Sequence, residues 1–294
     1  MEKLVQRLPN GESIAYLAQG NGKTPLVLLH GNLSSSVFYQ PLLDRLPSTI
    51  RVIAPDLRGF GDSSYEHRFD SLQELAEDIK SLLTILKVKQ IDLVGWSLGG
   101  GVAMELCATY PELVKHLILI NSTSHKGYPI FQKNAQNQPL FGQVYQKKDD
   151  LAKDPLQVLP VTMAITAKNA AFMTYIYDLT IYTVKKPTLE ANKIYIEEAL
   201  KERCLVDADF GLATLNLSDS IGFYGMGNGK IKNIQCPVLH VWGTSDRTVP
   251  EMMILDNIKA MEKTSTYLRW EDCGHSPLVD QPDKLTQSIL DFLR

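Results

Sequence analysis

The sequence predicts an α/β fold with a mainly parallel, doubly wound central sheet. Short apolar runs recur along the first half of the chain, and each suits a strand that is buried on both faces. Helical stretches with one apolar face separate the runs, and this alternation favours right-handed crossovers and parallel pairing. The same rhythm returns near the end of the chain. The apolar runs cover residues 26–29, 52–54, 91–94 and 117–120, and later 237–242 and 266–270.

An antiparallel hairpin is expected ahead of the first apolar run. Asn10-Gly11 suits a tight turn, so residues 3–8 and 13–18 should pair as strands. Between the second and third runs, Ser71 and Glu74 have the spacing of a capping box, and an apolar helical face follows them. The expected helices cover residues 71–86, 99–109 and 283–293.

Strand-like runs are scarce between residues 125 and 233, where helical stretches such as 189–201 dominate. We therefore expect a core domain formed by residues 1–124 and 234–294, with a helical cap domain of residues 125–233 inserted after the sixth strand. By count, the cap holds seven of the twelve tyrosines: Tyr128, Tyr145, Tyr175, Tyr177, Tyr182, Tyr195 and Tyr224. An aromatic cap of this size suggests a partly enclosed apolar pocket.

Composition excludes several classes of partner. The net charge of −3 and the lack of any basic run longer than a lysine pair argue against nucleic-acid binding. The four cysteines form neither a CxxC pair nor a zinc-ligand pattern, so we expect reduced thiols and no metal. No apolar run approaches the length of a bilayer span. We expect a cytoplasmic protein without integral membrane association, and the sequence leaves its oligomeric state open.

Residues 95–99, Gly-Trp-Ser-Leu-Gly, fit the pattern G-x-S-x-G directly after an apolar run and directly before an expected helix. A nucleophile elbow requires this strand-turn-helix setting. The strained turn must push the serine Oγ out of the sheet, so its flanks must be small, and Gly95 and Gly99 meet that demand. A helix that starts after Ser97 also aims backbone N–H groups at developing negative charge. Ser97 is the predicted nucleophile.

A serine hydroxyl needs a base to take its proton, and the base needs a carboxylate to orient it. His275 follows the last expected strand in the turn-rich segment 273–277, where we expect a mobile, exposed imidazole. Asp246 follows the strand before it, at the carboxyl edge where α/β sheets place their sites. Chain order Ser97, Asp246, His275 fits this kind of elbow. His240 lies in an apolar strand and is expected to pack in the core. The remaining histidines outside any catalytic motif are His67, His116 and His125.

Four further motifs accompany the elbow in a fixed order. They are His30-Gly31-Asn32, the segment from Asp56 to Ser63, Gly243-Thr244-Ser245-Asp246, and Gly274-His275. Together the five motifs resemble the capped α/β hydrolases over almost the whole chain, and the resemblance implies the α/β-hydrolase fold. Dehalogenases and epoxide hydrolases of that family have an aspartate as the nucleophile of the elbow. Because this chain has Ser97 there, both classes are disfavoured. Residues 95–100 are also similar to the lipase-box variant of intracellular polyhydroxybutyrate depolymerases of bacteria.

The resemblance further implies an oxyanion hole made by two backbone N–H groups, those of Asn32 and Leu98. It implies that the segment around Arg58 and Gly61 braces the site without taking part in the chemistry. His30 is likewise expected to be structural.

We therefore expect a serine hydrolase, an esterase that cleaves carboxylic esters through an acyl-enzyme, with no cofactor. Its expected partner is a small ester or a polyester oligomer, and a 3-hydroxybutyrate oligomer depolymerase is the first alternative. Cofactor-free perhydrolases and carbon–carbon bond hydrolases share the triad, and a hydrolase-like ligand receptor shares the fold. Fold and triad do not select among these, because specificity resides in the cap and pocket.

Overall fold

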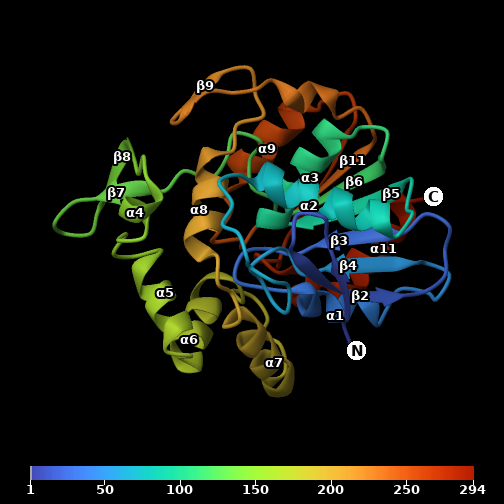
Figure 1. The fold of residues 1–294 in the computed structure, drawn as a ribbon, viewed down its shortest axis with the longest axis horizontal. Coiled ribbons are helices and arrows are strands. Elements are labelled where there is room, and N and C mark those ends of the chain that lie inside the picture. The colour runs from blue at the N-terminus through green and yellow to red at the C-terminus, as the bar shows by residue number, and fades with distance from the viewer. Residues whose placement is uncertain (1) are drawn as a thin grey trace.

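The chain folds around an eight-stranded sheet with helices on both faces (Figure 1). The computed structural model describes residues 2–294. The strand order is β1-β2-β4-β3-β5-β6-β11-β12, in which β2 runs antiparallel to β1 and β4 while the other neighbours pair in parallel. The strands are β1 (Leu4–Arg7), β2 (Ser13–Gln19), β3 (Leu26–Leu29), β4 (Val52–Pro55), β5 (Ile91–Trp96), β6 (Val114–Ile120), β11 (Val238–Gly243) and β12 (Ser265–Trp270).

This sheet confirms the predicted fold class and the N-terminal hairpin. The largest difference in a strand boundary is in β6, which begins at Val114 although the apolar run begins at Leu117. Lys115 is exposed and His116 is half-buried, so the start of the strand lacks the continuous apolar signal on which the prediction depended.

Two hydrophobic cores lie on opposite faces of the sheet, because successive side chains of a strand point to opposite sides. In β3, Val27 and Leu29 belong to the core that contains the apolar faces of α2 and α3. Leu26 and Leu28 belong to the other core, which contains residues of α1, α10 and α11. The helices around the sheet are α1 (Gln40–Leu43), α2 (Leu72–Ile85), α3 (Leu98–Thr109), α9 (Glu251–Ala260), α10 (Pro277–Asp280) and α11 (Pro282–Phe292), with the 3₁₀ turns η1 (Ser36–Tyr39) and η2 (Lys230–Asn233).

Helix α2 begins where the sequence predicts, but the predicted capping box is wrong. Ser71 is the N-cap residue, yet its side chain makes no capping hydrogen bond. The carboxylate of Glu74 instead accepts a 2.7 Å hydrogen bond from the backbone N–H of Asp70. The acidic side chain therefore satisfies a donor one residue earlier than the box requires.

A long inserted segment, residues 121–237, connects β6 to β11 and extends to one side of the sheet (Figure 1). As the sequence predicts, most of its regular structure is helical. It also contains two short antiparallel hairpins that the sequence analysis missed. The elements are β7 (Phe131–Lys133), β8 (Pro139–Val144), α4 (Lys148–Leu151), α5 (Leu159–Thr166), α6 (Ala170–Thr180), α7 (Leu189–Ala199), α8 (Leu205–Thr214), β9 (Ile221–Gly222) and β10 (Gly225–Met226).

The missed hairpin β7–β8 has a local cause that an apolar pattern does not reveal. Its turn is held by Asn134, whose side-chain oxygen accepts hydrogen bonds at 2.9 Å from the backbone N–H groups of Gln136 and Gln138. Asn137 takes a left-handed conformation with φ of 60°. Asparagine tolerates that conformation well, so turn chemistry forms this hairpin without a buried apolar strand.

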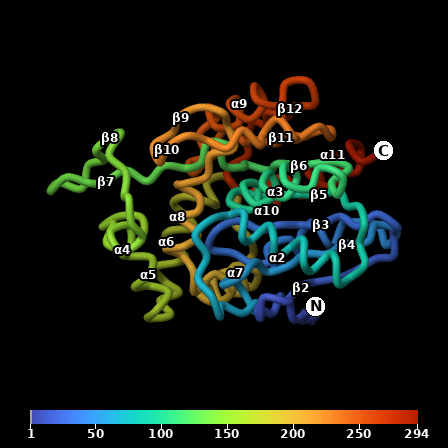
Figure 2. Tube along the Cα trace, turned by 45° about the horizontal axis from the view of Figure 1, so that its top comes forward, coloured from blue at the N-terminus to red at the C-terminus, as the bar shows by residue number. Residues whose placement is uncertain are grey.

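Two views place the far end of the inserted segment. In Figures 1 and 2, β7, β8, α4 and α5 lie at the end of the molecule opposite the C-terminus. Within residues 2–294, no helix combines the length and apolar character needed to cross a bilayer.

Candidate active site

Ser97 occupies a strained turn between β5 and α3. Its backbone has φ of 55° and ψ of −119°, a conformation that serine rarely adopts. A Cβ added to Gly95 would lie 2.4 Å from the backbone oxygen of Gly99, and one added to Gly99 would lie 2.2 Å from the backbone oxygen of Leu29. Only glycine fits at either position, so the strand, the sharp turn and the helix stand where the sequence predicts an elbow.

The ring of His275 is paired with Asp246. The Nδ1 atom of His275 lies 2.9 Å from Oδ2 of Asp246. The other carboxylate oxygen, Oδ1, accepts hydrogen bonds from the backbone N–H groups of Thr248 at 2.7 Å and Val249 at 2.9 Å. Burial acts to raise the pKa of Asp246, but its interaction with His275 and these hydrogen bonds outweigh burial, and the pKa lies below its usual value. Asp246 therefore stays ionised and can hold the imidazole.

The expectation of an exposed imidazole is wrong, since His275 is only 2% exposed. Trp96 donates a hydrogen bond from its indole N–H to the backbone oxygen of His275 at 2.8 Å, and the two ring centroids lie 5.7 Å apart. The preceding Gly274 N–H donates to the buried carboxylate of Asp280 at 2.7 Å. These contacts fix the loop on both sides of the histidine.

Asn121 is a member of this site that the sequence analysis missed. It follows β6 with φ of 43°, and its side-chain amide donates to Oδ2 of Asp246 at 2.5 Å and to the backbone oxygen of Gly274 at 3.0 Å. One side chain thereby joins the loop of the acid to the loop of the histidine. A polar residue directly after a buried strand was the available signal.

The loop after β3 lies directly beside Ser97. A Cβ added to Gly31 would lie 3.1 Å from the Cβ of Ser97, so a larger residue would press on the serine. Asn32 follows and lines the same pocket as Ser97. Leu98, the second residue of the predicted oxyanion hole, is the first residue of α3.

A pocket of about 290 Å³ brings these residues together. Trp96, Ser97 and His275 come from the sheet and its carboxyl edge, whereas residues of α6 and the turn after it come from the inserted segment. The walls thus combine polar groups with apolar side chains, as small-molecule sites do. The remaining lining residues are Gly31, Asn32, Leu33, Tyr128, Gln157, Ile176, Tyr177, Thr180, Ile181, Arg247 and Thr248.

The other histidines lie outside this pocket and make structural contacts. His30 is fully buried, and its Nε2 accepts a 3.0 Å hydrogen bond from the backbone N–H of Leu57. Burial lowers the pKa of His30 to about 4, so it stays neutral. His240 is buried in β11 as expected, and its Nε2 lies 3.1 Å from the hydroxyl of Ser265.

The segment after β4 is held by polar contacts to neighbouring elements. Arg58 donates two hydrogen bonds of 2.7 Å to the carboxylate of Asp78 in α2. Gly61 has φ of 47°, and a Cβ there would lie 2.3 Å from Oδ2 of Asp56. Arg58 thus fastens this loop to α2, the close approach of Asp56 leaves room only for glycine at position 61, and neither residue lines the pocket of Ser97.

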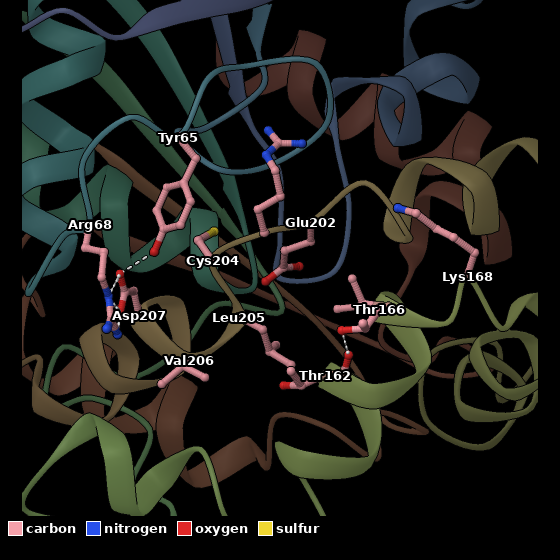
Figure 3. A pocket seen from close by; sticks show the side chains of 12 residues that line it. Tyr65, Arg68, Thr162, Thr166, Lys168, Glu202, Cys204, Leu205, Val206 and Asp207 are labelled. Carbon is pink, nitrogen blue, oxygen red and sulfur yellow. Dashed lines mark hydrogen bonds and ion pairs between the residues drawn. The ribbon is translucent and has the colours of Figure 1, made fainter.

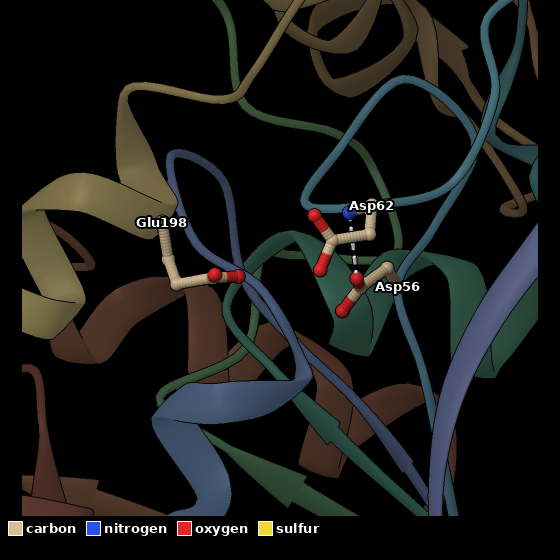
Figure 4. A group of neighbouring side chains, drawn as sticks. All are labelled: Asp56, Asp62 and Glu198. Atoms are coloured by element: carbon tan, nitrogen blue, oxygen red, sulfur yellow. Dashed lines mark hydrogen bonds between the residues drawn. The ribbon is translucent and has the colours of Figure 1, made fainter. Parts of the chain in front are cut away.

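Three carboxylates outside the pocket lie close enough together to hold a metal ion: Asp56, Asp62 and Glu198 (Figure 4). The ammonium of Lys3 already lies among them, at 2.7 Å from Asp56, 2.7 Å from Asp62 and 2.9 Å from Glu198. A lysine ammonium supplies the compensating charge that a cation would otherwise supply. Lys3 and the three carboxylates form an ion-pair network, the Lys3 tie, that joins the N-terminal strand region, the loop after β4 and α7.

Comparison with known proteins assigns the chain to a family. A family model described as alpha/beta hydrolase fold matches residues 24–282. The chain belongs to this family. Among solved structures of alpha/beta hydrolases, the esterase RhEst1 from Rhodococcus sp. ECU1013 superimposes with a TM-score of 0.71 at 25% identity, covering 100% of this chain and 98% of that one.

Curated relatives of this alpha/beta hydrolase include another esterase. A pimeloyl-[acyl-carrier protein] methyl ester esterase of Vibrio atlanticus is 24% identical over 284 residues, which cover 96% of this chain and 98% of the relative. A cis-3-alkyl-4-alkyloxetan-2-one decarboxylase of Shewanella oneidensis is 37% identical over 120 residues, 38% of this chain and 36% of the relative. The match to that relative, and to several mycobacterial ones, covers only about a third of the relative's length. The proteins to which this alpha/beta hydrolase is similar thus include esterases and a decarboxylase.

Proposed function

We propose that this protein is a carboxylic ester hydrolase in which Ser97, His275 and Asp246 form the catalytic triad. The observation that carries the proposal is the 2.9 Å contact between His275 and Asp246 in a chain whose Ser97 stands on a strained elbow in the same pocket. A hydroxyl, a base and an orienting carboxylate are the parts that acyl transfer needs.

In the proposed reaction, Oγ of Ser97 attacks the ester carbonyl while His275 takes the serine proton. The carbonyl oxygen becomes an oxyanion, which accepts hydrogen bonds from the backbone N–H groups of Asn32 and Leu98. His275 then gives the proton to the departing alkoxide, which leaves as the alcohol. Water, activated by His275 in the same way, attacks the acyl-enzyme and releases the carboxylic acid.

The shape of the pocket and the relatives support an ester as substrate. A volume of about 290 Å³ with mixed polar and apolar walls suits a small ester better than a long fatty chain. The relatives that match across their full length include a methyl ester esterase, and RhEst1 is an esterase of the same fold. We propose that the protein acts in the cytoplasm, where thiols such as those of its four cysteines stay reduced.

A panel of nitrophenyl esters tests the proposal and separates it from a ligand receptor. We expect many turnovers by the parent protein and none above background by Ser97→Ala, which removes only the nucleophilic oxygen. A fluorophosphonate should label the parent and leave the variant unlabelled. A parent protein that releases a single equivalent of nitrophenol and then stops is a receptor and contradicts the proposal.

The polyester alternative calls for a different substrate series. Chains of 3-hydroxybutyrate carry an ester every few atoms, so units bound away from the scissile bond add binding energy. If the protein acts on such chains, kcat/KM should rise from dimer to trimer or tetramer. A flat series removes the depolymerase hypothesis and leaves the triad untouched.

A further inference from the structure

The loop that carries Asn32 is held from outside by buried acidic side chains of the inserted segment. Asn32 donates from its side-chain Nδ2 to Oδ1 of Asp209 in α8 at 2.9 Å. The next residue, Leu33, donates its backbone N–H to Oε2 of Glu202 at 2.9 Å. Glu202 lies between α7 and α8, and both carboxyl groups are buried. Two neighbouring loop residues are therefore each fastened to a different carboxyl group.

Leu33 has a strained backbone, and hydrogen bonds with the inserted segment hold it in that conformation. Its φ of 52° lies in the left-handed region, which is costly for a leucine. Glu202 holds the N–H of this residue, and the hydroxyl of Tyr177 in α6 donates to its backbone oxygen. With both polar groups of Leu33 held, the peptide that follows Asn32 cannot rotate freely. The orientation of Asn32 is thereby fixed from the inserted segment.

The charge state of the two acids suits a place beside developing negative charge. Burial raises the pKa of Glu202 well above its usual value, and the neighbouring carboxyl group of Asp209 raises it further. Burial raises the pKa of Asp209 to about 7. When either acid is protonated, it still accepts a hydrogen bond through its carbonyl oxygen and adds no full negative charge near an oxyanion. For Asp209 the protonated form predominates below about pH 7.

Glu202 also lines a second pocket, of about 480 Å³, together with Cys204 and Leu205 (Figure 3). Its second oxygen, Oε1, is buried and has no hydrogen-bond partner among the described residues. A buried acid with one oxygen on a catalytic loop and the other unpaired is costly to keep, which argues for a specific role.

We propose that Glu202 and Asp209 are positioning residues that hold the Asn32–Leu33 segment so that the backbone N–H of Asn32 faces the oxyanion. This inference rests on the proposed function, and it assigns to the inserted segment a part in catalysis beyond enclosing the pocket. Neither acid needs to touch the substrate to do so.

The test compares truncation with conservative replacement at each acid. Glu202→Ala and Asp209→Ala should lower kcat on a nitrophenyl ester at least tenfold, roughly one decade short of removing an oxyanion donor outright, with KM changed by less than about threefold. Glu202→Gln and Asp209→Asn retain an acceptor oxygen and should restore kcat to within about threefold of the parent. Tyr177→Phe removes one hydroxyl without a cavity and should also lower kcat, which provides a readout if an alanine variant fails to fold.

Asp207 offers a matched control on the same helix. It is also buried, but it accepts hydrogen bonds from Arg68 and Tyr65 instead of the loop. Asp207→Asn should leave kcat within twofold of the parent even if the melting temperature falls.

Fluorophosphonate labelling separates failure of this inference from failure of the proposed function, because phosphonylation also develops a negative oxygen. A parent that is never labelled contradicts the proposed function. A parent that is labelled at the same rate as folded Glu202→Ala and Asp209→Ala contradicts the positioning role alone. Amide variants that lose as much kcat as the alanine variants also contradict the positioning role.

Discussion

Asp246 and Asp280 both contact the loop of His275, and their contacts differ. Asp246 contacts the imidazole, whereas Asp280 accepts hydrogen bonds from the backbone N–H groups of Gly274 and Lys185. Asp246→Asn should lower kcat by about four orders of magnitude, because the amide does not hold the tautomer that accepts the serine proton. The measurement is kcat on one nitrophenyl ester at neutral pH.

The companion variant, Asp280→Asn, should mainly affect stability. It replaces one acceptor of a buried pair of hydrogen bonds by a donor, and we expect a loss of about 2 kcal/mol in the free energy of unfolding. Its kcat should stay within about tenfold of the parent. A larger loss of kcat in Asp280→Asn than in Asp246→Asn would mean that Asp246 is not the acid of the triad.

The buried carboxyl group of Asp209 makes stability depend on pH. Its pKa in the folded protein is about 7, above the value of 3.8 for a free aspartate. The raised pKa contributes stability that is fully present below pH 3.8 and is lost as the pH rises to about 7. Asp209→Asn lacks this loss, so it should gain on the parent by roughly 3 kcal/mol between about pH 4 and about pH 8. Urea unfolding at both pH values measures the difference in free energy of unfolding between Asp209→Asn and the parent. If this difference is the same at the two pH values, Asp209 is not buried as described.

Several contacts of the site were beyond the reach of sequence reasoning for one physical reason. Asn121 contacts an acid 125 positions later, and Asp209 contacts an amide 177 positions earlier. Neither contact leaves a local pattern. Ser97, Asp246 and His275 could be proposed from the sequence because each stands in a short motif whose glycines and neighbouring strand reflect local geometry.

At the scale of single elements, the elbow depends on close approach between β5 and α3. A methyl group at Gly95 would meet backbone atoms of Gly99 and Gly100 at 2.4 and 2.6 Å, and backbone cannot move aside as a flexible side chain can. Gly95→Ala should therefore lower the free energy of unfolding by about 3 kcal/mol or more and displace Ser97. Thermal unfolding and fluorophosphonate labelling measure the two effects. A variant that melts with the parent and is labelled normally would show that the elbow tolerates a side chain.

Elements with a regular apolar pattern were predicted well, and those held by polar contacts were not. The strands of the sheet bury both faces and read as continuous apolar runs, as β3 does. The hairpins β7–β8 and β9–β10 are largely solvent-exposed, so no buried face marks them in the sequence. Helix α9 was not expected either, because only Ile254 and Asn257 of its ten residues are buried.

At the scale of the whole molecule, Lys3 ties distant parts of the chain together. Its ammonium contacts carboxylates of the β4 loop and of α7 in the inserted segment. Lys3→Met would leave Asp56 buried without its counter-charge, while Glu198 would keep its ion pair with Lys201. We expect a loss of about 3 kcal/mol in the free energy of unfolding. Lys193→Met is the control, since the ion pair of Lys193 with Glu197 is exposed and 4.0 Å long. Equal effects of the two substitutions would mean that the tie adds no stability.

The division into a core domain and a cap domain remains a prediction at this scale. Residues of α6 and the turn after it line the pocket of Ser97, and α8 holds the loop of Asn32. The inserted segment therefore contributes walls and supporting contacts to a site whose expected reacting groups follow strands β5, β11 and β12 at the edge of the sheet.

The acyl-enzyme on Ser97 is the species that the proposed chemistry requires. The most direct measurement mixes the parent protein with excess nitrophenyl acetate, quenches it in acid before turnover is complete, and locates the added acetyl group by peptide mass spectrometry. We predict one acetyl group on Ser97, and none on the same peptide of Ser97→Ala. An acetyl group at another residue, or turnover that persists in Ser97→Ala, would contradict this prediction.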